Sequence, residues 1–157
     1  MHDVETGSVR FRPAKAGDLA AIVALLADDP LGREREEGGP ELDTRYREAF
    51  AAIERDPHQL LAVAERGNRI VGVLQLTFIP GLTRRGMWRG QIEGVRVVAA
   101  ERGSGVGRSM LEWAIEECRN RGCGLVQLTS DERRADAHRF YDALGFRATH
   151  RGYKLPL

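Results

Sequence analysis

Hydrophobic and polar residues follow two different periods along the chain, and each period predicts one kind of element. Apolar and basic residues alternate over residues 9–12, which predicts a short strand that ends at Pro13. Apolar residues then recur at helical spacing over residues 19–26, behind Asp18 at the positive end of the predicted helix. The first predicted unit is therefore a strand followed by a helix.

Turn-forming residues divide the next part of the chain. Residues 28–42 hold two prolines and three glycines and are expected to form a loop. A second helix should start at Asp43 and stop before Pro57, because the residue before a proline disfavours the helical conformation. The Gly-Asn pair at 67–68 is typical of a hairpin turn. The predicted strands that it joins are 60–64 and 69–78.

Strands and helices also alternate in the second half of the chain. A loop around Gly81 leads into this half, and Gly145 closes its last helix, since glycine is favoured just past a helix C-terminus. Without a repeat or a linker, the pattern predicts one α/β (α+β) domain over residues 1–157, with a mixed, mostly antiparallel sheet. The predicted elements are a strand at 87–98, a helix at 105–119, a strand at 125–128, a helix at 134–144 and one or two closing strands in 146–157.

Composition and charge narrow the class of partner. The chain has 157 residues, 42% of them apolar, which is enough for one buried core. Its net charge of +1 gives no strong field toward nucleic acid or a membrane, so neither is an expected partner. Cys118 and Cys123 lack companion ligands at zinc spacing, so neither a metal site nor a disulfide framework is expected. No signal peptide or membrane span is apparent, and a cytoplasmic protein is expected.

The richest stretch of the chain is a glycine turn between a predicted strand and the long helix. It reads Glu101-Arg102-Gly103-Ser104-Gly105-Val106-Gly107-Arg108. The free N–H groups and the dipole of a helix N-terminus form a site for a diphosphate. A Walker A loop is excluded because Arg102 and Arg108 replace its first glycine and its lysine, and a dinucleotide fingerprint would need glycine at 108. A tight turn with glycine caps remains the alternative.

Three motifs in register resemble the GNAT acetyltransferase superfamily. Residues 102–107 match its coenzyme A motif, Q/R-x-x-G-x-G/A. The sequence Ile92-Glu93-Gly94-Val95-Arg96-Val97 resembles its fourth strand, and residues 137–146 resemble the motif around its last helix. Within the superfamily, residues 136–141 and the 90–97 strand are similar to aminoalkylphosphonate N-acetyltransferases.

The resemblance implies a fold, a cosubstrate and a set of contacts. The fold is a central mixed, mostly antiparallel sheet flanked by about four helices. The cosubstrate is acetyl-CoA, attacked directly by a primary amine in a ternary complex, with no metal and in a protein that forms a homodimer. The diphosphate would lie on the turn, the pantetheine arm on the fourth strand and a tyrosine beside the sulfur. By position, the implied cofactor-binding residues are Val95, Val97, Arg102, Gly103, Ser104, Gly105, Val106, Gly107, Arg108, Ser130 and Tyr141.

Tyr141 and Glu93 are the implied catalytic residues. Tyr141 would donate a hydrogen bond to the leaving thiolate, because proton transfer from a phenol of pKa ~10 to a thiolate of pKa ~8.5 is uphill. Its alternative role is packing in an apolar helical stripe. Glu93 is the candidate general base, acting through a water or with a pKa raised by burial. The related pattern I-Q-E-L places the acid one residue later, on the opposite strand face, so a solvated carboxylate is the alternative.

The remaining polar residues leave the acceptor open. His138 is a candidate for reaching a ligand but is more typical of a helix surface, and Arg133 and Arg134 suit either a coenzyme A phosphate or solvent. Arginines in residues 83–89 suit an anionic acceptor. The expected reaction is acetylation of a small amine; the alternatives are a protein N-terminus or lysine, or a non-catalytic sensor of acyl-CoA.

Overall fold

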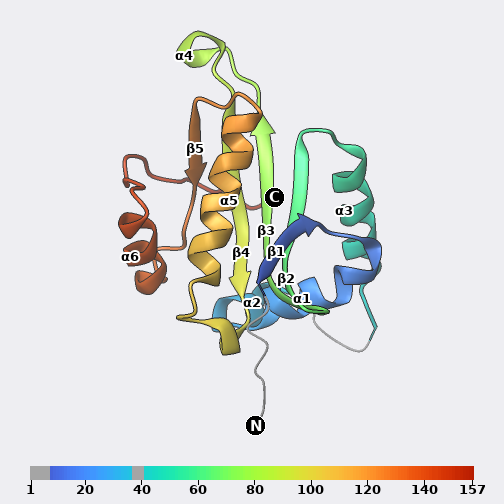
Figure 1. The fold of residues 1–157 in the computed structure, drawn as a ribbon. Coiled ribbons are helices and arrows are strands. Elements are labelled where there is room, and N and C mark those ends of the chain that lie inside the picture. Colours follow the sequence, from blue (N-terminus) through green and yellow to red (C-terminus); the bar gives the residue numbers. More distant parts are fainter. Residues whose placement is uncertain (1–7, 37–40) are drawn as a thin grey trace. The chain divides into compact units, whose positions relative to one another are not determined.

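The computed structural model describes residues 8–36 and 41–157, and these form one five-stranded sheet with six α-helices (Figure 1). Short 3₁₀ turns at Ala16–Asp18 and Ala99–Glu101 precede α1 and the glycine turn. The strands are β1 (Val9–Pro13), β2 (Gln59–Arg66), β3 (Arg69–Ile79), β4 (Arg89–Val97) and β5 (Leu125–Leu128). The helices are α1 (Leu19–Ala27), α2 (Pro30–Arg35), α3 (Thr44–Arg55), α4 (Thr83–Gly86), α5 (Val106–Asn120) and α6 (Ala135–Ala143).

The described chain forms two compact units. The first runs as far as Gln127 and contains β1 to β4, the helices α1 to α5 and most of β5. The second runs from Leu128 onward and contains α6 and the C-terminal tail. The glycine turn (residues 101–108) and Glu93 therefore belong to the N-terminal unit, and Ser130 and Tyr141 belong to the C-terminal unit.

The sheet is mixed, as the sequence predicts. Its strand order is β1-β2-β3-β4-β5, and the pairs from β1 to β4 are all antiparallel. β5 follows β4 through the long helix α5, and the two strands run in the same direction (Figure 1). The predicted hairpin turn is also present, since β2 and β3 are joined by Gly67 and Asn68, with Gly67 at φ +60°.

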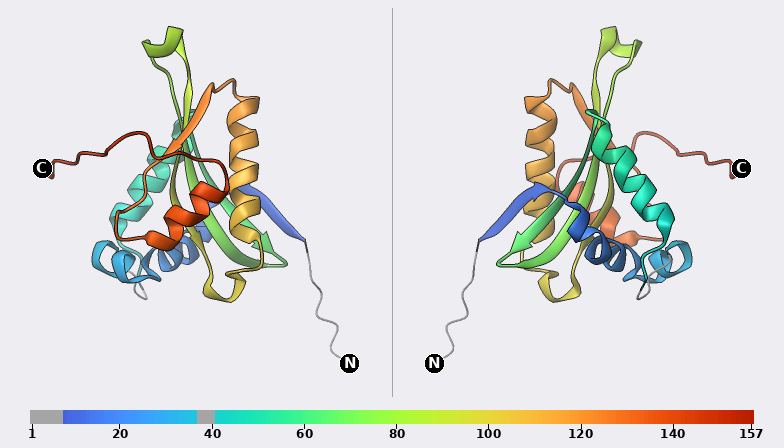
Figure 2. Two further views of the ribbon diagram at one scale, coloured as in Figure 1. Left: turned by 90° about the vertical axis from the view of Figure 1, so that its left-hand side faces the viewer. Right: turned by 90° about the vertical axis from the view of Figure 1, so that its right-hand side faces the viewer.

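Helices cover both faces of the sheet in the N-terminal unit, with α1 and α3 on one face and α5 on the other (Figure 2). Neighbouring residues of β3 show the alternation. Val73 packs in the cluster that contains Ile22 of α1, whereas the Cα of Gly72 faces the sulfur of Met110 on α5. The helix predicted for residues 105–119 is confirmed as α5, and its hydrophobic pattern places Val106, Met110, Ala114 and Cys118 in one buried stripe.

Close packing joins the first half of β4 to α5. A Cβ added to Gly90 would lie 2.2 Å from Cys118 Sγ, so only glycine fits there without a shift of the helix. Burial raises the pKa of the Cys118 thiol to about 12, so this side chain stays protonated and behaves as a small apolar group. Gly90 thereby fixes the distance between sheet and helix.

A β-bulge divides β4 at Gly94. Val73 pairs with Arg96 and Gln75 pairs with Glu93, so Gly94 and Val95 stand together against one residue of β3. Gly94 adopts φ +64°, a left-handed conformation that favours glycine. Because of the extra residue, Glu93 and Arg96 lie on the same face of the sheet although they are three positions apart.

The prediction of a loop over residues 28–42 is wrong for residues 30–35, which form α2. The Asp29 side chain accepts a hydrogen bond from the Gly32 N–H, and Pro30 occupies the first helical position. This pairing of an N-cap aspartate with an N1 proline starts a helix despite the polar surroundings. Residues 37–40 of the predicted loop lie outside the described residues.

The prediction of closing strands in residues 146–157 is also wrong, because this segment has no strand. An extended segment becomes a strand only when its N–H and C=O groups pair with a neighbour. Tyr153, Leu155 and Leu157 are instead highly exposed. The loop around Gly81 includes the single turn α4, in which Arg84 and Arg85 both have positive φ.

Candidate functional site

The glycine turn joins the end of β4 to the start of α5. Gly103 and Gly105 have φ +82° and +90°, and a Cβ on either residue would meet nothing within 4 Å. The backbone conformation, and not crowding, therefore requires glycine at both positions. Gly105 is the N-cap of α5, so the N–H groups of Val106, Gly107 and Arg108 lie in the first turn, where a helix offers them no internal partner. This arrangement can hold an anion such as a diphosphate.

The Glu101 side chain stabilises the glycine turn through hydrogen bonds. Its carboxylate accepts hydrogen bonds from the Ser104 hydroxyl at 3.0 Å and from Arg66 Nε at 3.1 Å. The Ser104 hydroxyl and the Arg66 guanidinium hold the pKa of Glu101 below its usual range. Arg66 ends β2, so this ion pair ties the β2–β3 hairpin to the turn.

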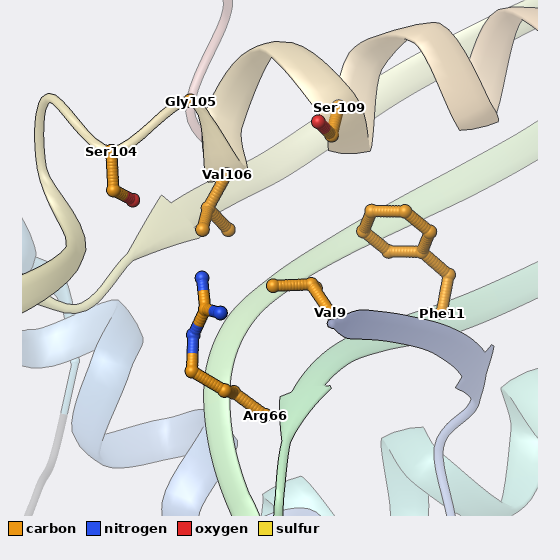
Figure 3. A pocket seen from close by; sticks show the side chains of 7 residues that line it. All are labelled: Val9, Phe11, Arg66, Ser104, Gly105, Val106 and Ser109. Atoms are coloured by element: carbon orange, nitrogen blue, oxygen red, sulfur yellow. The ribbon is translucent and has the colours of Figure 1, made fainter. Parts of the chain in front are cut away.

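A cavity of about 270 Å³ lies beside the turn, between β1 and the first residues of α5 (Figure 3). The Arg66 side chain extends across it toward Val106. The walls are apolar on the β1 side and carry hydroxyl groups on the α5 side. The lining residues are Val9, Phe11, Arg66, Ser104, Gly105, Val106 and Ser109.

The two arginines at the rim differ: among residues 8–36 and 41–157, an ion pair is formed by Arg108 but not by Arg102. Arg108 Nε lies 2.9 Å from Glu112 Oε1, one helical turn further along α5. Arg102 follows the 3₁₀ turn and is exposed. The exposed Arg102 guanidinium is open to solvent beside the turn, and its predicted contact with a diphosphate stays a prediction.

The second half of β4 has a free edge in the N-terminal unit. The Val98 N–H donates to Val71 O at 2.9 Å, so alternation along an antiparallel ladder turns the N–H and C=O of Val97 away from β3. On that side, Gln127 lies level with Gln91, to which it donates a hydrogen bond at 3.0 Å, and the unit ends there. Within this unit the main chain of Val97 could therefore pair with an extended ligand, and its predicted contact with the pantetheine arm stays a prediction.

Val95 differs from Val97 in one respect. Its carbonyl accepts a hydrogen bond from Arg96 Nη1 at 2.8 Å. Arg96 Nε also lies 3.5 Å from Asp29 Oδ2, beside α2. The Val95 carbonyl therefore already has one partner, although a carbonyl oxygen can accept two hydrogen bonds.

Glu93 lies on the sheet face that α1 and α3 cover, and its side chain is exposed. The Thr77 hydroxyl of β3 is 3.4 Å from Glu93 Oε1. The carboxylate is therefore open to a ligand approaching that face. Of the two predicted routes, proton transfer through a water suits this exposed position, because solvent reaches the carboxylate.

Two further predicted residues belong to the C-terminal unit. Tyr141 lies on α6, and its ring contacts Phe140 and Phe146 at centroid distances of 5.4 and 5.9 Å. Ser130 lies between β5 and α6. The resemblance implies that Tyr141 and Ser130 bind the same cofactor as the glycine turn, and this stays a prediction.

The polar residues around α6 have local partners. His138 Nε2 is hydrogen bonded to the Asp131 carbonyl at 2.9 Å, which closes the segment before α6. Arg133 donates to both carboxylate oxygens of Asp131. These contacts favour a structural role for His138 and Arg133.

Across residues 8–36 and 41–157, no group of three or more His, Cys, Asp or Glu side chains is placed to hold a metal ion. Within the same ranges, no helix combines the length and the apolar character needed to cross a membrane.

Residues 19–146 match the model of the Acetyltransferase (GNAT) family. The chain is 36% identical over 111 residues to the aminoalkylphosphonate N-acetyltransferase of Salmonella typhimurium, covering 70% of this chain and 71% of that one. It is 40% identical over 90 residues to the glucosamine 6-phosphate N-acetyltransferase of Trypanosoma brucei brucei, covering 57% and 59%.

A solved structure resembles the whole chain. The crystal structure of a protein named as a transcriptional regulator, from Bacillus halodurans C-125, has a TM-score of 0.93 and 49% identity, covering 96% of this chain and 100% of that one. The chain belongs to the GNAT acetyltransferase family, whose members are acetyl-CoA-dependent acyltransferases.

The structure also reveals residues that the sequence did not indicate. Arg66 and Glu101 are 35 positions apart, and no local period relates them. The spacing of Glu101 and Ser104 was a detectable signal, because side chains three positions apart in a turn can meet. Thr77 lies next to Glu93 only because of the register between β3 and β4.

Proposed function

We propose that this protein transfers the acetyl group of acetyl-CoA to a primary amine of a small molecule, by direct attack in a ternary complex. The observation that carries the proposal is the junction of β4 and α5. There, a positive-φ glycine turn opens a helix N-terminus directly after a strand whose outer edge is free. A diphosphate suits the turn, and an extended amide-bearing arm suits the edge.

The reaction forms a nitrogen–carbon bond and breaks a carbon–sulfur bond. The neutral amine attacks the thioester carbonyl, and coenzyme A leaves as a thiolate after collapse of the tetrahedral intermediate. One proton must leave the nitrogen, and one must reach or stabilise the sulfur. Hydrogen-bond donors placed for the developing oxyanion lower the barrier.

Glu93 and Tyr141 divide the proton transfers in this proposal. Glu93 accepts the amine proton through a water, because its carboxylate is exposed and a carboxylate is a weak base toward an ammonium but a better match for the acidic intermediate. Tyr141 donates a hydrogen bond to the thiolate. A phenol can do this without giving up its proton.

An acceptor that joins an amine to an oxyanion is supported by two observations. The aminoalkylphosphonate and glucosamine 6-phosphate N-acetyltransferases to which the chain is similar are named for substrates that each combine an amine with a phosphorus oxyanion. This chain places Arg84, Arg85 and Arg89 in and after the β3–β4 loop. Arginine is suited to such oxyanions because its guanidinium binds two oxygens at once.

A second candidate, a non-catalytic sensor of acyl-CoA, is favoured by one observation. The Bacillus halodurans protein that shares 49% identity with this chain is named as a transcriptional regulator. The near-neutral net charge of +1 gives no support for direct nucleic-acid binding. A regulator of this kind would bind acetyl-CoA without transferring its acetyl group.

The proposal includes a homodimer in the cytoplasm without a membrane or nucleic-acid partner. The exposed large apolar side chains of Tyr153, Leu155 and Leu157 are compatible with self-association, since burying them in an interface would remove apolar surface from water. Light scattering at several protein concentrations tests the oligomeric state.

Thiol release from acetyl-CoA tests the central proposal, with a no-amine control for hydrolysis. The amine panel should contain aminoalkylphosphonates, amino sugars and their phosphates, polyamines and short peptides. Release above the control, confirmed by mass spectrometry of the acetylated amine, is the expected result. Tyr141→Phe should then lower kcat with an unchanged acetyl-CoA Kd. Coenzyme binding without transfer to any amine would favour the sensor.

A further inference from the structure

A line of polar side chains crosses the sheet on the face that α1 and α3 cover. Gln59 pairs opposite Thr77, Thr77 pairs opposite Gln91, and Gln91 is hydrogen bonded to Gln127. Residues directly opposite each other in a ladder share a face, so the line includes one residue from each of four strands. Gln75, Glu93 and Arg89 lie on the same face beside it. We call these seven residues the polar row: Gln59, Gln75, Thr77, Arg89, Gln91, Glu93 and Gln127.

The end of the polar row near Glu93 has more acceptors than donors. Gln59 Oε1 accepts hydrogen bonds from Gln75 Nε2 and from the Thr77 hydroxyl, both at 2.9 Å. Thr77 has one hydroxyl proton, so it cannot donate to Gln59 and to Glu93 at the same time. The Glu93 carboxylate and the Thr77 oxygen therefore both face a site that needs donors. A primary amine or ammonium supplies them.

The other end of the polar row presents donors. Arg89 Nη1 donates to Gln127 Oε1 at 3.3 Å, and Gln127 Nε2 donates to Gln91 Oε1 at 3.0 Å. The side-chain oxygens of Gln127 and Gln91 thus each accept a hydrogen bond. A ligand can still bind the side-chain N–H groups of Gln91 and the remaining N–H groups of the Arg89 guanidinium. Such a group of donors is suited to an oxyanion.

We propose that the polar row binds the acceptor and selects a hydroxylated primary amine that carries an oxyanion several bonds from its nitrogen, the pattern of a phosphorylated amino sugar. The amine faces Glu93 and Thr77, and the oxyanion faces Gln91 and Arg89. Hydroxyl groups between the amine and the oxyanion can hydrogen bond to the glutamine side chains in the middle of the polar row, because a hydroxyl both donates and accepts. This inference rests on the proposed acetyl transfer and names its substrate class.

The spacing of the two ends favours a long acceptor. Glu93 and Gln91 are two residues apart on one face, about 7 Å along the strand, and Arg89 lies about 13 Å from Glu93 at ~3.3 Å per residue. A two-carbon spacer between amine and phosphorus spans only a fraction of this distance. A sugar ring with a phosphate on its exocyclic carbon covers the shorter interval and places its oxyanion within reach of the long arginine side chain.

Four acceptors separate these features. Glucosamine 6-phosphate has all of them, glucosamine lacks the oxyanion, 6-aminohexyl phosphate lacks the hydroxyl groups, and 2-aminoethylphosphonate lacks the length. We expect kcat/KM at saturating acetyl-CoA to be highest for glucosamine 6-phosphate. Loss of the phosphate or of the hydroxyl groups should each lower it about tenfold or more, because a hydrogen bond to a charged group or several neutral ones are lost.

Variants assign the discrimination to the polar row. Arg89→Gln should bring the glucosamine 6-phosphate to glucosamine ratio of kcat/KM close to one, with an unchanged KM for acetyl-CoA. Thr77→Val should lower kcat/KM for all four acceptors by a similar factor, because Thr77 faces the amine that they share. Arg47→Gln, an exposed arginine on α3 outside the polar row, is the charge-matched control and should leave the ratio unchanged.

The outcomes separate this inference from the proposed function. Acetylation of all four amines at similar kcat/KM, or a ratio unaltered by Arg89→Gln, overturns the role of the polar row and leaves acetyl transfer in place. If no amine is acetylated above the hydrolysis control, calorimetry with glucosamine 6-phosphate decides. Binding to the wild type that is lost in Arg89→Gln supports the polar row while the proposed function fails. Absence of binding to the wild type overturns both.

Discussion

Residues 89–93 and residues 95–97 belong to one strand, β4, but they have different neighbours. The first half lies between β3 and β5, carries polar row residues on one face and packs Gly90 against Cys118 on the other. The second half pairs with β3 only, within the N-terminal unit, and leads into the glycine turn. In the proposed function, this single strand offers a fixed surface to the acceptor and an edge that is free within the N-terminal unit to an extended cofactor.

The bulge at Gly94 makes this division possible. A regular strand would place residues 93 and 96 on opposite faces. The extra residue puts Glu93 and Arg96 on one face and re-aims the main chain beyond it. If the proposed sites are correct, acceptor chemistry and coenzyme binding should respond separately to substitutions on either side of the bulge.

The largest effect is expected from Glu93→Gln, which changes only the first half. Glutamine keeps the size of the side chain but cannot accept the proton, so kcat should fall about 10²-fold or more. The KM for acetyl-CoA should stay within error. Steady-state kinetics measure both, and Glu48→Gln on α3, an exposed glutamate, is the matched control. An undiminished kcat would assign Glu93 to the solvated surface.

Gly105→Ala should impair the second half selectively. Alanine at φ +90° is strained by roughly 1–3 kcal/mol, so either the turn distorts or the protein loses stability. We expect kcat/KM for acetyl-CoA to fall about tenfold, with the preference among acceptors preserved. Gly17→Ala, where the added Cβ meets nothing and φ is ordinary, is the control. Equal coenzyme affinity in both variants would contradict the assignment of the turn.

Gly90→Ala should reduce stability without a specific effect on coenzyme binding. The new methyl would overlap Cys118 Sγ, and overpacking of this kind costs about 1–3 kcal/mol. For a chain of this size, each kcal/mol lowers Tm by roughly 2–4 °C. The double variant Gly90→Ala, Cys118→Ala should recover part of the loss in thermal unfolding. No recovery would place the strain elsewhere.

The smallest expected effect is a pH-dependent loss of stability when the hydrogen-bonded carboxylate of Glu101 is replaced. Ser104 and Arg66 lower the pKa of Glu101 in the folded protein, so the ionised carboxylate stabilises the fold above the ordinary glutamate pKa of ~4.3. This contribution is lost as the pH falls through the lowered pKa. The Tm difference between wild type and Glu101→Gln should therefore be present at neutral pH and disappear in acid. A difference that persists in strong acid would exclude this ionisation as its origin.

Local patterns predicted most of the fold. The α5 stripe, the Gly-Asn hairpin turn and the short strand 125–128 all depend on residues close in sequence, and all are confirmed. The signal for α2 was also local, in Asp29 and its following proline, and the polar composition concealed it. The tail shows the opposite failure, since a strand needs a pairing partner that its own sequence cannot specify.

The site was predicted less completely because it depends on register. A glycine inside a predicted strand often marks a bulge, so Gly94 was a local signal for the bulge in β4. The pairing of Arg66 with Glu101 and the line of Gln59, Thr77 and Gln91 require the alignment of separate strands. The family resemblance predicted the roles of the glycine turn and of Tyr141, but the motifs on which it rests say little about the sheet face that would bind the acceptor.

The free edge of β4 has a consequence for the protein without its coenzyme. An edge with unpaired N–H and C=O groups is a template on which another chain can add a strand and begin to aggregate. The bulge at Gly94 gives partial protection, because it bends the edge away from the flat geometry that such pairing needs. A bound pantetheine arm would cover the rest. Coenzyme A would then act as a solubility factor for its own enzyme, protecting the strand between turnovers.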